Sequence, residues 1–305
     1  MTTKVKKVIS LNTIFRYILL VIFLAIFGLI LRQNEYDKKQ SVDNSPVISV
    51  LPEIVLPGDP IMISINSTST VKEITHDGKK LGVVDYDGKP RAFAAIAFDD
   101  KKTQHKITAQ FSNGSNYEKI INITPREKIN KPLGIPDSLG GNTKSAGKSL
   151  VNNLAEENVL INNVKSANTA FWSKSFVKPL EKIYVTDQYG YNRNTVGYNI
   201  LHKGTDFRAE VGTPVSAINS GRVVMSKSLT VYGNTVIIDH GYGLVSLYMH
   251  LSKLDVKEGD SVKVGQIIGL SGKTGYAEAP HLHISIKVNG VSIDPVTFFE
   301  FFNVL

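Results

Sequence analysis

The chain has 305 residues and a formal net charge of +8, and its 42% hydrophobic and 20% charged residues exclude wholesale disorder and low-complexity fibres. It contains no cysteine, which excludes a disulfide scaffold, a thiolate zinc site, an iron–sulfur cluster and a cysteine nucleophile. More than half of the positive excess lies in residues 1–40, which carry seven Lys and Arg against two Asp and Glu. Because a nucleic-acid-binding protein would concentrate this charge on a folded basic face, no nucleic-acid partner is expected.

An uncharged apolar run near the N-terminus, Tyr17–Leu31, predicts a membrane anchor within residues 1–46. Its 15 residues are few for a spanning helix of about 20 and many for a signal-peptide core. No small-x-small cleavage site follows, which favours an uncleaved anchor over a removed signal. Because Lys4, Lys6 and Lys7 precede the run, we expect a cytoplasmic tip and a single pass of the cell (inner) membrane, with everything after the tether outside the cytoplasm.

After a polar tether at residues 33–46, residues 47–125 predict a small β-sandwich. Short β-type runs alternate there with Asp-Gly and Asn-Gly turn signals, a pattern typical of sandwich strands. His76 stands beside a turn and His105 at a strand start, and both are expected to be ordinary surface residues. The segment is interpreted as a spacer or a binding module.

Residues 126–172 predict a linker followed by one helix. The segment opens with a Pro- and Gly-rich stretch, and apolar residues then recur near helical spacing from Leu150 to Val164. We therefore expect a helix over 143–168 whose apolar stripe packs on the core. The strand pattern returns in residues 173–305, where most of the glycines lie, so the fold class is mainly β.

Five of the seven histidines lie in the last 104 residues. His281 and His283 alternate with apolar residues, so a strand would place both on one face, as a solvated pair or as metal ligands. His202 and Asp206 are four apart, but Gly204 between them disfavours a helix, so a loop would have to bring them together. Taken alone, that second pair is equally compatible with a surface hydrogen bond.

Two further histidines complete the set. His250 lies in an apolar β-type run, whereas His240 has a turn-like context and is interpreted as structural. Two histidines and one carboxylate suit zinc with an open position for water or a scissile carbonyl, and leftover imidazoles can move the protons. The chain has no HExxH motif to supply a glutamate for that purpose. The same ligand set would also suit an Fe(II) oxygenase.

A series of motifs follows in one order between Phe176 and Pro295: HKGTDF at 202–207, GTPV at 212–215, YGN at 232–234, YMHL at 248–251, GKTG at 272–275 and PHLH at 280–283. This stretch resembles the lysostaphin-type, or LytM-like, zinc endopeptidases, which cut peptide cross-links of bacterial peptidoglycan. The region before residue 125 resembles the immunoglobulin-like domain that precedes this peptidase in some bacterial proteins. The resemblance implies an antiparallel β-sheet domain with a groove over the metal.

The resemblance also implies roles for five residues. One zinc ion per chain would be bound by His202, Asp206 and His283. His250 and His281 would be catalytic, polarising the attacking water and stabilising the oxyanion. The implied substrate is a peptidoglycan stem peptide, with both D-Ala–diaminopimelate cross-links and glycine bridges possible.

Three alternatives remain beside this enzyme. A catalytically silent LytM-like regulator of other cell-wall hydrolases would normally lack some of the five residues, all of which are present. An iron oxygenase fits poorly with the extra histidines and the export signal. An adhesion or scaffolding protein would act through residues 47–124. A regulatory protein partner is compatible with any of these interpretations, and the sequence identifies none.

Overall fold

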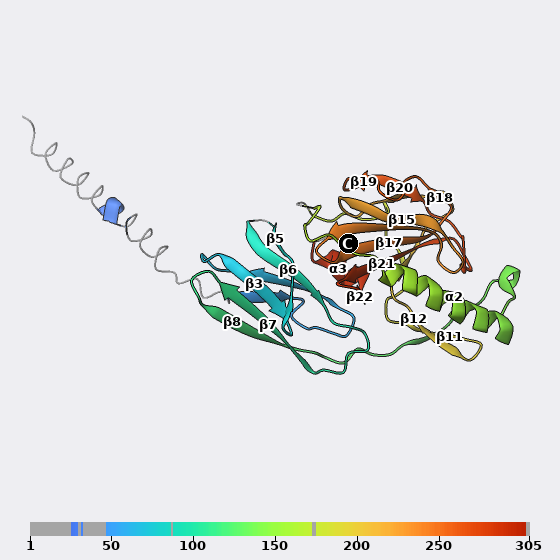
Figure 1. Cartoon of the computed structure of the whole chain (residues 1–305), viewed down its shortest axis with the longest axis horizontal. Coiled ribbons are helices and arrows are strands. Elements are labelled where there is room, and N and C mark those ends of the chain that lie inside the picture. The colour runs from blue at the N-terminus through green and yellow to red at the C-terminus, as the bar shows by residue number, and fades with distance from the viewer. Residues whose placement is uncertain (1–25, 30–31, 33–46, 87, 173–174, 303–305) are drawn as a thin grey trace, which may run out of the picture. The chain divides into compact units, whose positions relative to one another are not determined.

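The computed structural model describes residues 26–29, 32, 47–86, 88–172 and 175–302. The chain divides into two units, residues 1–46 and 47–305, and the elements discussed below all belong to the second (Figure 1). Residues 26–29 of the predicted anchor are helical, and the rest of Tyr17–Leu31 lies outside the described residues. Among the helices that the structure describes, none combines the length and the apolar character needed to span a bilayer. The anchor therefore stays a prediction.

Residues 47–123 form two four-stranded antiparallel sheets, called here the N-terminal sheet pair. The first sheet has the order β1 (Ile48–Leu51), β2 (Pro60–Ile65), β6 (Lys89–Ala95) and β5 (Val83–Tyr86). The second has the order β4 (Lys79–Lys80), β3 (Val71–His76), β7 (Gln104–Phe111) and β8 (Asn116–Asn122). Fully buried isoleucines from both sheets, among them Ile61, Ile63, Ile74 and Ile107, form their common core.

The prediction that His76 and His105 are ordinary surface residues is wrong. His105 is only 4% exposed, and the two rings lie against each other with their centroids 5.0 Å apart. The physical reason is the register of β3 on β7, which pairs His76 with Ile107 and places His105 diagonally across from it on the same face.

Residues 126–172 contribute β9 (Asn130–Pro132), a 3-10 turn η1 (Asp137–Leu139) and helix α2 (Lys144–Asn162). The predicted helix is confirmed, and the Thr143 hydroxyl caps its start by accepting the N–H of Ala146 at 3.2 Å. It ends six residues earlier than predicted, since Ser166 and the backbone N–H of Ala167 bond instead to the buried carboxylate of Asp239, at 2.5 and 2.9 Å.

The C-terminal part is built on an antiparallel sheet, as predicted. Its strand order is β10 (Val185–Asp187), β13 (Thr205–Arg208), β21 (His281–Val288), β17 (Leu244–Leu251), β16 (Gly233–Gly241), β15 (Gly221–Leu229) and β19 (Ser261–Val262), with β22 (Val291–Ile293) beside β21. A small sheet holds β14 (Pro214–Ser216), β20 (Ile267–Leu270) and β18 (Lys253–Leu254), and another holds β12 (Tyr198–Leu201), β11 (Asn192–Thr195) and β9. Helix α3 (Pro295–Glu300) follows, capped by Asp294.

The N-terminal sheet pair and the C-terminal part share buried contacts. Phe93 of β6 and Phe298 of α3 lie in one apolar cluster with their ring centroids 5.8 Å apart. Arg126 forms ion pairs with Asp59 before β2 and with Asp294 at the start of α3. The segment predicted as a linker therefore carries a cation that joins both parts.

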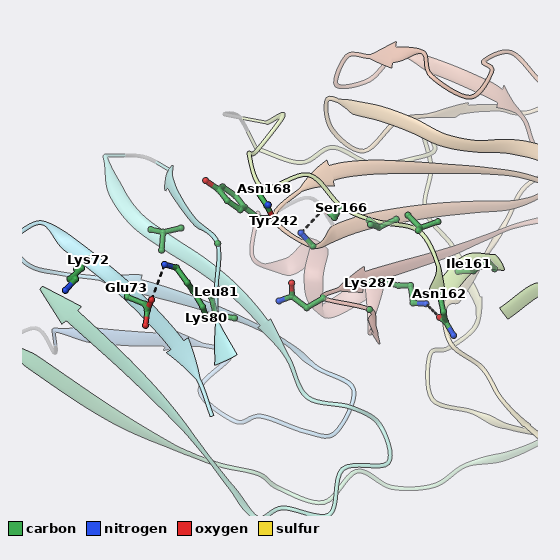
Figure 2. A pocket seen from close by; sticks show the side chains of 17 residues that line it. Lys72, Glu73, Lys80, Leu81, Ile161, Asn162, Ser166, Asn168, Tyr242 and Lys287 are labelled. Atoms are coloured by element: carbon green, nitrogen blue, oxygen red, sulfur yellow. Dashed lines mark hydrogen bonds and ion pairs between the residues drawn. The ribbon is translucent and has the colours of Figure 1, made fainter. Parts of the chain in front are cut away.

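A pocket of about 830 Å³ lies between strands of the sheet pair and the β21–β22 turn. Figure 2 shows the side chains along its wall: Lys80 pairs with Glu73 at 3.1 Å, and Lys287 donates to Asn162 at 2.5 Å. Burial lowers the pKa of Lys287 from 10.5 to about 8.

Candidate active site

Three of the predicted residues converge beside the central sheet. Strands β13 and β21 pair so that Asp206 stands directly opposite His283, and the loop before β13 brings in His202. His202 Nε2 lies 3.1 Å from His283 Nδ1, and Asp206 Oδ1 lies 2.7 Å from His283 Nδ1 and 3.3 Å from His202 Nε2. All three side chains are buried. The expected loop, rather than a helix, therefore joins His202 to Asp206.

In His202 and His283, the ring nitrogen that faces away from Asp206 forms a hydrogen bond, and these bonds show which nitrogen of each ring carries the proton. His202 Nδ1 faces the carbonyl oxygen of Gln188 at 2.7 Å and must donate to it. Ser285 Oγ donates to the Lys203 carbonyl at 2.8 Å, so it accepts from His283 Nε2 at 2.9 Å. The unprotonated nitrogens of both rings are then the two that face Asp206. This assignment follows from the hydrogen-bond network.

Charge and geometry suit a metal ion. Burial lowers the pKa of His283 to about 4, so this ring is neutral at pH 7. Burial raises the pKa of the Asp206 carboxyl, but the positive charge and hydrogen bonds that His202 and His283 provide in their protonated forms outweigh burial and hold this pKa well below its usual range. Without a metal ion, a proton on either ring therefore stabilises the carboxylate, and a metal cation can take the place of that charge. Tetrahedral zinc with bonds of about 2.0–2.1 Å needs ligand atoms about 3.3–3.4 Å apart. The separations here are 3.3, 3.1 and 2.7 Å, so the carboxylate oxygen and His283 Nδ1 would have to move apart to take up the ion. The donor set therefore suits zinc after this shift.

Two neighbours shape this cluster further. The guanidinium of Arg193 forms ion pairs with Asp187 and with the second oxygen of Asp206. A Cβ built on Gly204 would stand 2.4 Å from His283 Nε2 and 2.4 Å from the carbonyl oxygen of Ile284. Only glycine lets the loop pass this close to the ring.

His250 and His281 stand at the mouth of the same site. Their ring centroids are 4.8 Å apart, and His281 Nε2 lies 3.7 Å from Asp206 Oδ1. Each ring donates its Nδ1–H to a backbone carbonyl, of Thr274 and Ala279 respectively, both at 2.8 Å, which leaves both Nε2 atoms as acceptors. Burial, aided by the neighbouring imidazoles, lowers the pKa of His250 to about 3, so this ring is neutral.

The backbone at His250 is strained. Its φ of +60° lies in the left-handed region, and the register of β16 on β17 shifts beside it. By contrast, His240 lies in the core, where Nδ1 contacts the Ser220 carbonyl and Nε2 contacts the Ser246 hydroxyl, both at 2.8 Å. The structural interpretation of His240 thus fits, although it lies within a strand rather than a turn.

Two pockets are lined in part by the five residues. A pocket of about 430 Å³ has apolar walls from Leu154 of α2, Tyr198 of β12 and Tyr276. Another of about 520 Å³ is lined by polar residues that include Arg208 and Glu278. His250 lines both pockets. Ser285, which fixes the His283 proton, was not among the predicted site residues, although its place two residues after His283 put it on the same strand face.

Residues 200–295 match peptidase family M23. Over 119 residues the chain is 45% identical to lysostaphin from Staphylococcus simulans, covering 37% of this chain and 24% of that protein. Over 89 residues it is 48% identical to the peptidoglycan DD-endopeptidase ShyA from Vibrio cholerae, covering 29% and 21%. The chain thus spans about a quarter of the length of these curated relatives.

One solved structure shares the fold over most of both chains. It is described as a peptidase M23 from Pseudomonas aeruginosa, with a TM-score of 0.58, 24% identity, and 80% of this chain and 94% of that chain covered. At this level of identity the likeness shows the shared fold alone. Residues 200–295 thus contain a segment that matches peptidase family M23 and aligns with lysostaphin and ShyA, as the motifs predicted.

Proposed function

We propose that the chain is a zinc-dependent endopeptidase that hydrolyses peptide cross-links of bacterial peptidoglycan. One observation carries the proposal: inside the M23 domain, His202, Asp206 and His283 bring three ligand atoms to within 3.3 Å of one another, each nitrogen with its lone pair inward. Relatives of this domain are named lysostaphin and peptidoglycan DD-endopeptidase, which supports peptidoglycan as the substrate class.

The chain's own residues divide the work. His202, Asp206 and His283 would hold zinc, which when bound supplies Lewis-acid polarisation of a carbonyl and acidifies water. His250, kept neutral by burial, accepts the proton of the attacking water at Nε2. His281 Nε2 lies beside the same cluster, 3.7 Å from Asp206 Oδ1, and with a proton taken from solvent it would stabilise the developing oxyanion. The proton that His250 accepts from the water would then pass to the nitrogen of the leaving amine. The apolar wall with Tyr198 would hold the stem peptide in an extended form.

We also propose an arrangement along the chain. Residues 1–46 would hold the cytoplasmic tip, the anchor and the tether, residues 47–125 an immunoglobulin-like sandwich, residues 126–172 the linker and helix, and residues 173–305 the peptidase. The enzyme would then stand on the cell (inner) membrane and face the wall. The apolar run Tyr17–Leu31 with its basic flank supports this placement. A reporter fused to the C-terminus that is active only outside the cytoplasm would test it.

The experiment for the enzyme is digestion of purified peptidoglycan by the 305-residue chain, followed by mass spectrometry of the fragments. Cross-linked dimers should disappear, a zinc chelator should stop this, and added zinc should restore it. His283→Ala should lose both zinc and activity, whereas His250→Ala should keep zinc and lose activity. A folded, zinc-loaded chain that cleaves nothing would refute the enzyme and favour the regulator, and equal zinc loss in both variants would refute the division of roles.

A further inference from the structure

A second cluster of imidazole and carboxylate groups lies in the N-terminal sheet pair. It consists of His76 at the end of β3, Asp77 in the following turn and His105 at the start of β7. His76 Nε2 lies 3.1 Å from His105 Nδ1, and Asp77 Oδ2 lies 2.9 Å from the same nitrogen. In the part of the chain that the structure describes, only this cluster and that of His202 bring three such ligand atoms within 4.8 Å of one another.

The backbone holds these groups in place. Asp77 and Gly78, both at positive φ, form the two-residue turn between β3 and β4. The N–H of Asp77 donates to the Lys106 carbonyl at 2.8 Å, and Asp77 Oδ1 accepts the N–H of Lys106 at 2.9 Å. With one oxygen committed in this way, the other is directed at His105. The three ligand atoms therefore converge through the strand register and the turn.

Hydrogen bonds alone satisfy this cluster poorly. His105 Nδ1 faces both His76 Nε2 and Asp77 Oδ2, yet a ring nitrogen carries at most one proton. If it is protonated it donates well to only one of them, and if it is not, two lone pairs meet at the carboxylate. A cation between the three atoms attracts all of them.

Two of the three separations agree with those of the first cluster, whereas the ligand atoms of His76 and Asp77 lie within 4.8 Å of each other, against 3.3 Å between His202 Nε2 and Asp206 Oδ1. The two imidazole nitrogens are 3.1 Å apart in each, and the shorter carboxylate–nitrogen distance is 2.9 Å here against 2.7 Å there. His105 Nε2 is buried without a hydrogen-bond partner, and the carboxylate oxygen Asp100 Oδ2 lies 3.4 Å from it. A small rotation of the ring would give this nitrogen the carboxylate partner that metal-ligating histidines commonly have. We propose that His76, Asp77 and His105 form a second binding site for a divalent transition-metal ion of the zinc class.

The chemistry of the donors sets the class of ion. Two imidazoles and one carboxylate suit zinc and its neighbours, whereas magnesium and calcium prefer oxygen ligands. The ammonium of Lys102 now lies 2.6 Å from Asp77 Oδ2 and so competes for the same oxygen. Because its side chain is 60% exposed, it can move into solvent. The bound ion would tie the β3–β4 turn to β7, independently of the peptidase site.

Metal stoichiometry of the 305-residue chain tests the site. Chain stripped with a chelator is titrated with Zn²⁺ and analysed for metal after buffer exchange, and Co²⁺ provides an absorption signal for each site. The wild-type chain should bind two ions. The His283→Ala and His76→Ala variants should each bind one ion, and the variant that combines both substitutions should bind none. His76→Ala should leave peptidoglycan hydrolysis unchanged, since His76 does not touch the peptidase site.

The substitution Lys102→Met should instead increase the affinity of the second site for the metal ion. Removal of the competing ammonium should tighten the second site by about two- to fivefold, the range that an exposed ion pair contributes. Circular dichroism must show folded variants, and the half-buried position of His76 makes its replacement mild. The proposal is overturned if the wild-type chain binds a single ion that His283→Ala removes, or if His76→Ala still binds two. Failure of hydrolysis with both ions bound would affect only the proposed enzyme.

Discussion

Replacing Ser285 with alanine should weaken zinc binding without touching a zinc ligand. The Ser285 hydroxyl accepts from His283 Nε2 at 2.9 Å and donates to the Lys203 carbonyl at 2.8 Å. Without it the buried Nε2–H has no acceptor, so the tautomer that turns Nδ1 toward Asp206 is no longer favoured. An unsatisfied buried donor costs about 1–3 kcal/mol, which corresponds to roughly 10–100-fold at about 1.4 kcal/mol per factor of ten. Loss of such a supporting partner commonly has an effect of this size.

The assay is competition for zinc against a fluorescent chelator, with the Kd of Ser285→Ala compared with wild type. Ser226→Ala is the matched control, because the Ser226 hydroxyl also donates to a carbonyl, that of Val256 at 2.6 Å, in the same sheet but away from the histidines. The control should lower thermal stability and leave the zinc Kd within twofold. A Ser285→Ala variant with the wild-type Kd would refute the inference that this hydroxyl places the proton.

Other predictions concern packing and charge. Gly204→Ala would place a Cβ 2.4 Å from His283 Nε2 and should weaken zinc binding at least tenfold, and an unchanged Kd would show that the loop relaxes freely. Glu157→Ala removes the buried carboxylate that accepts the N–H of Val231 and of Tyr232, at 2.8 and 3.1 Å, and urea denaturation should show a loss of about 2–4 kcal/mol, less than 0.5 kcal/mol being inconsistent. Lys287→Met should stabilise the fold at pH 7 by about 1–2 kcal/mol after discounting for solvent, since the pKa lowered to about 8 means that the charged form is disfavoured. The folded state then holds fewer protons than the unfolded chain between pH 8 and 10.5, so wild-type stability should rise across that window and the variant's should not.

Local patterns predicted much of the fold because they act over a few residues. Alternation around His281 and His283 predicted the strand face correctly, and helical spacing predicted α2. The end of α2 could not be predicted, since it depends on the carboxylate of Asp239, which lies 73 residues beyond Ser166. A distant buried acceptor outweighed the local preference of the chain.

The arrangement of the candidate site also depends on contacts between residues far apart in the sequence, so local patterns could not predict it. Asp206 and His283 are 77 residues apart in the sequence, and only the pairing of β13 with β21 places them opposite each other. The direction of His250 depends on a positive φ and a register shift that an apolar strand pattern does not reveal. The order of motifs compensated for this by identifying the family, whereas alternation alone left a solvated pair equally plausible.

His76 and His105 show why a scattered histidine is hard to interpret from sequence. Each had an ordinary local context, and neither belonged to a motif, so each was assigned to the surface. What joins them is a diagonal position across two antiparallel strands and a carboxylate in the adjoining turn, which are properties of a register. In both histidine–aspartate clusters, a histidine on a strand lies next to a carboxylate on a neighbouring segment. Whether such a histidine can bind a metal depends on the group that faces its other ring nitrogen, because that group decides which nitrogen carries the proton. Ser285 is the acceptor for His283, two residues away, whereas Asp100 lies near His105 Nε2, at 3.4 Å, without accepting a hydrogen bond from it.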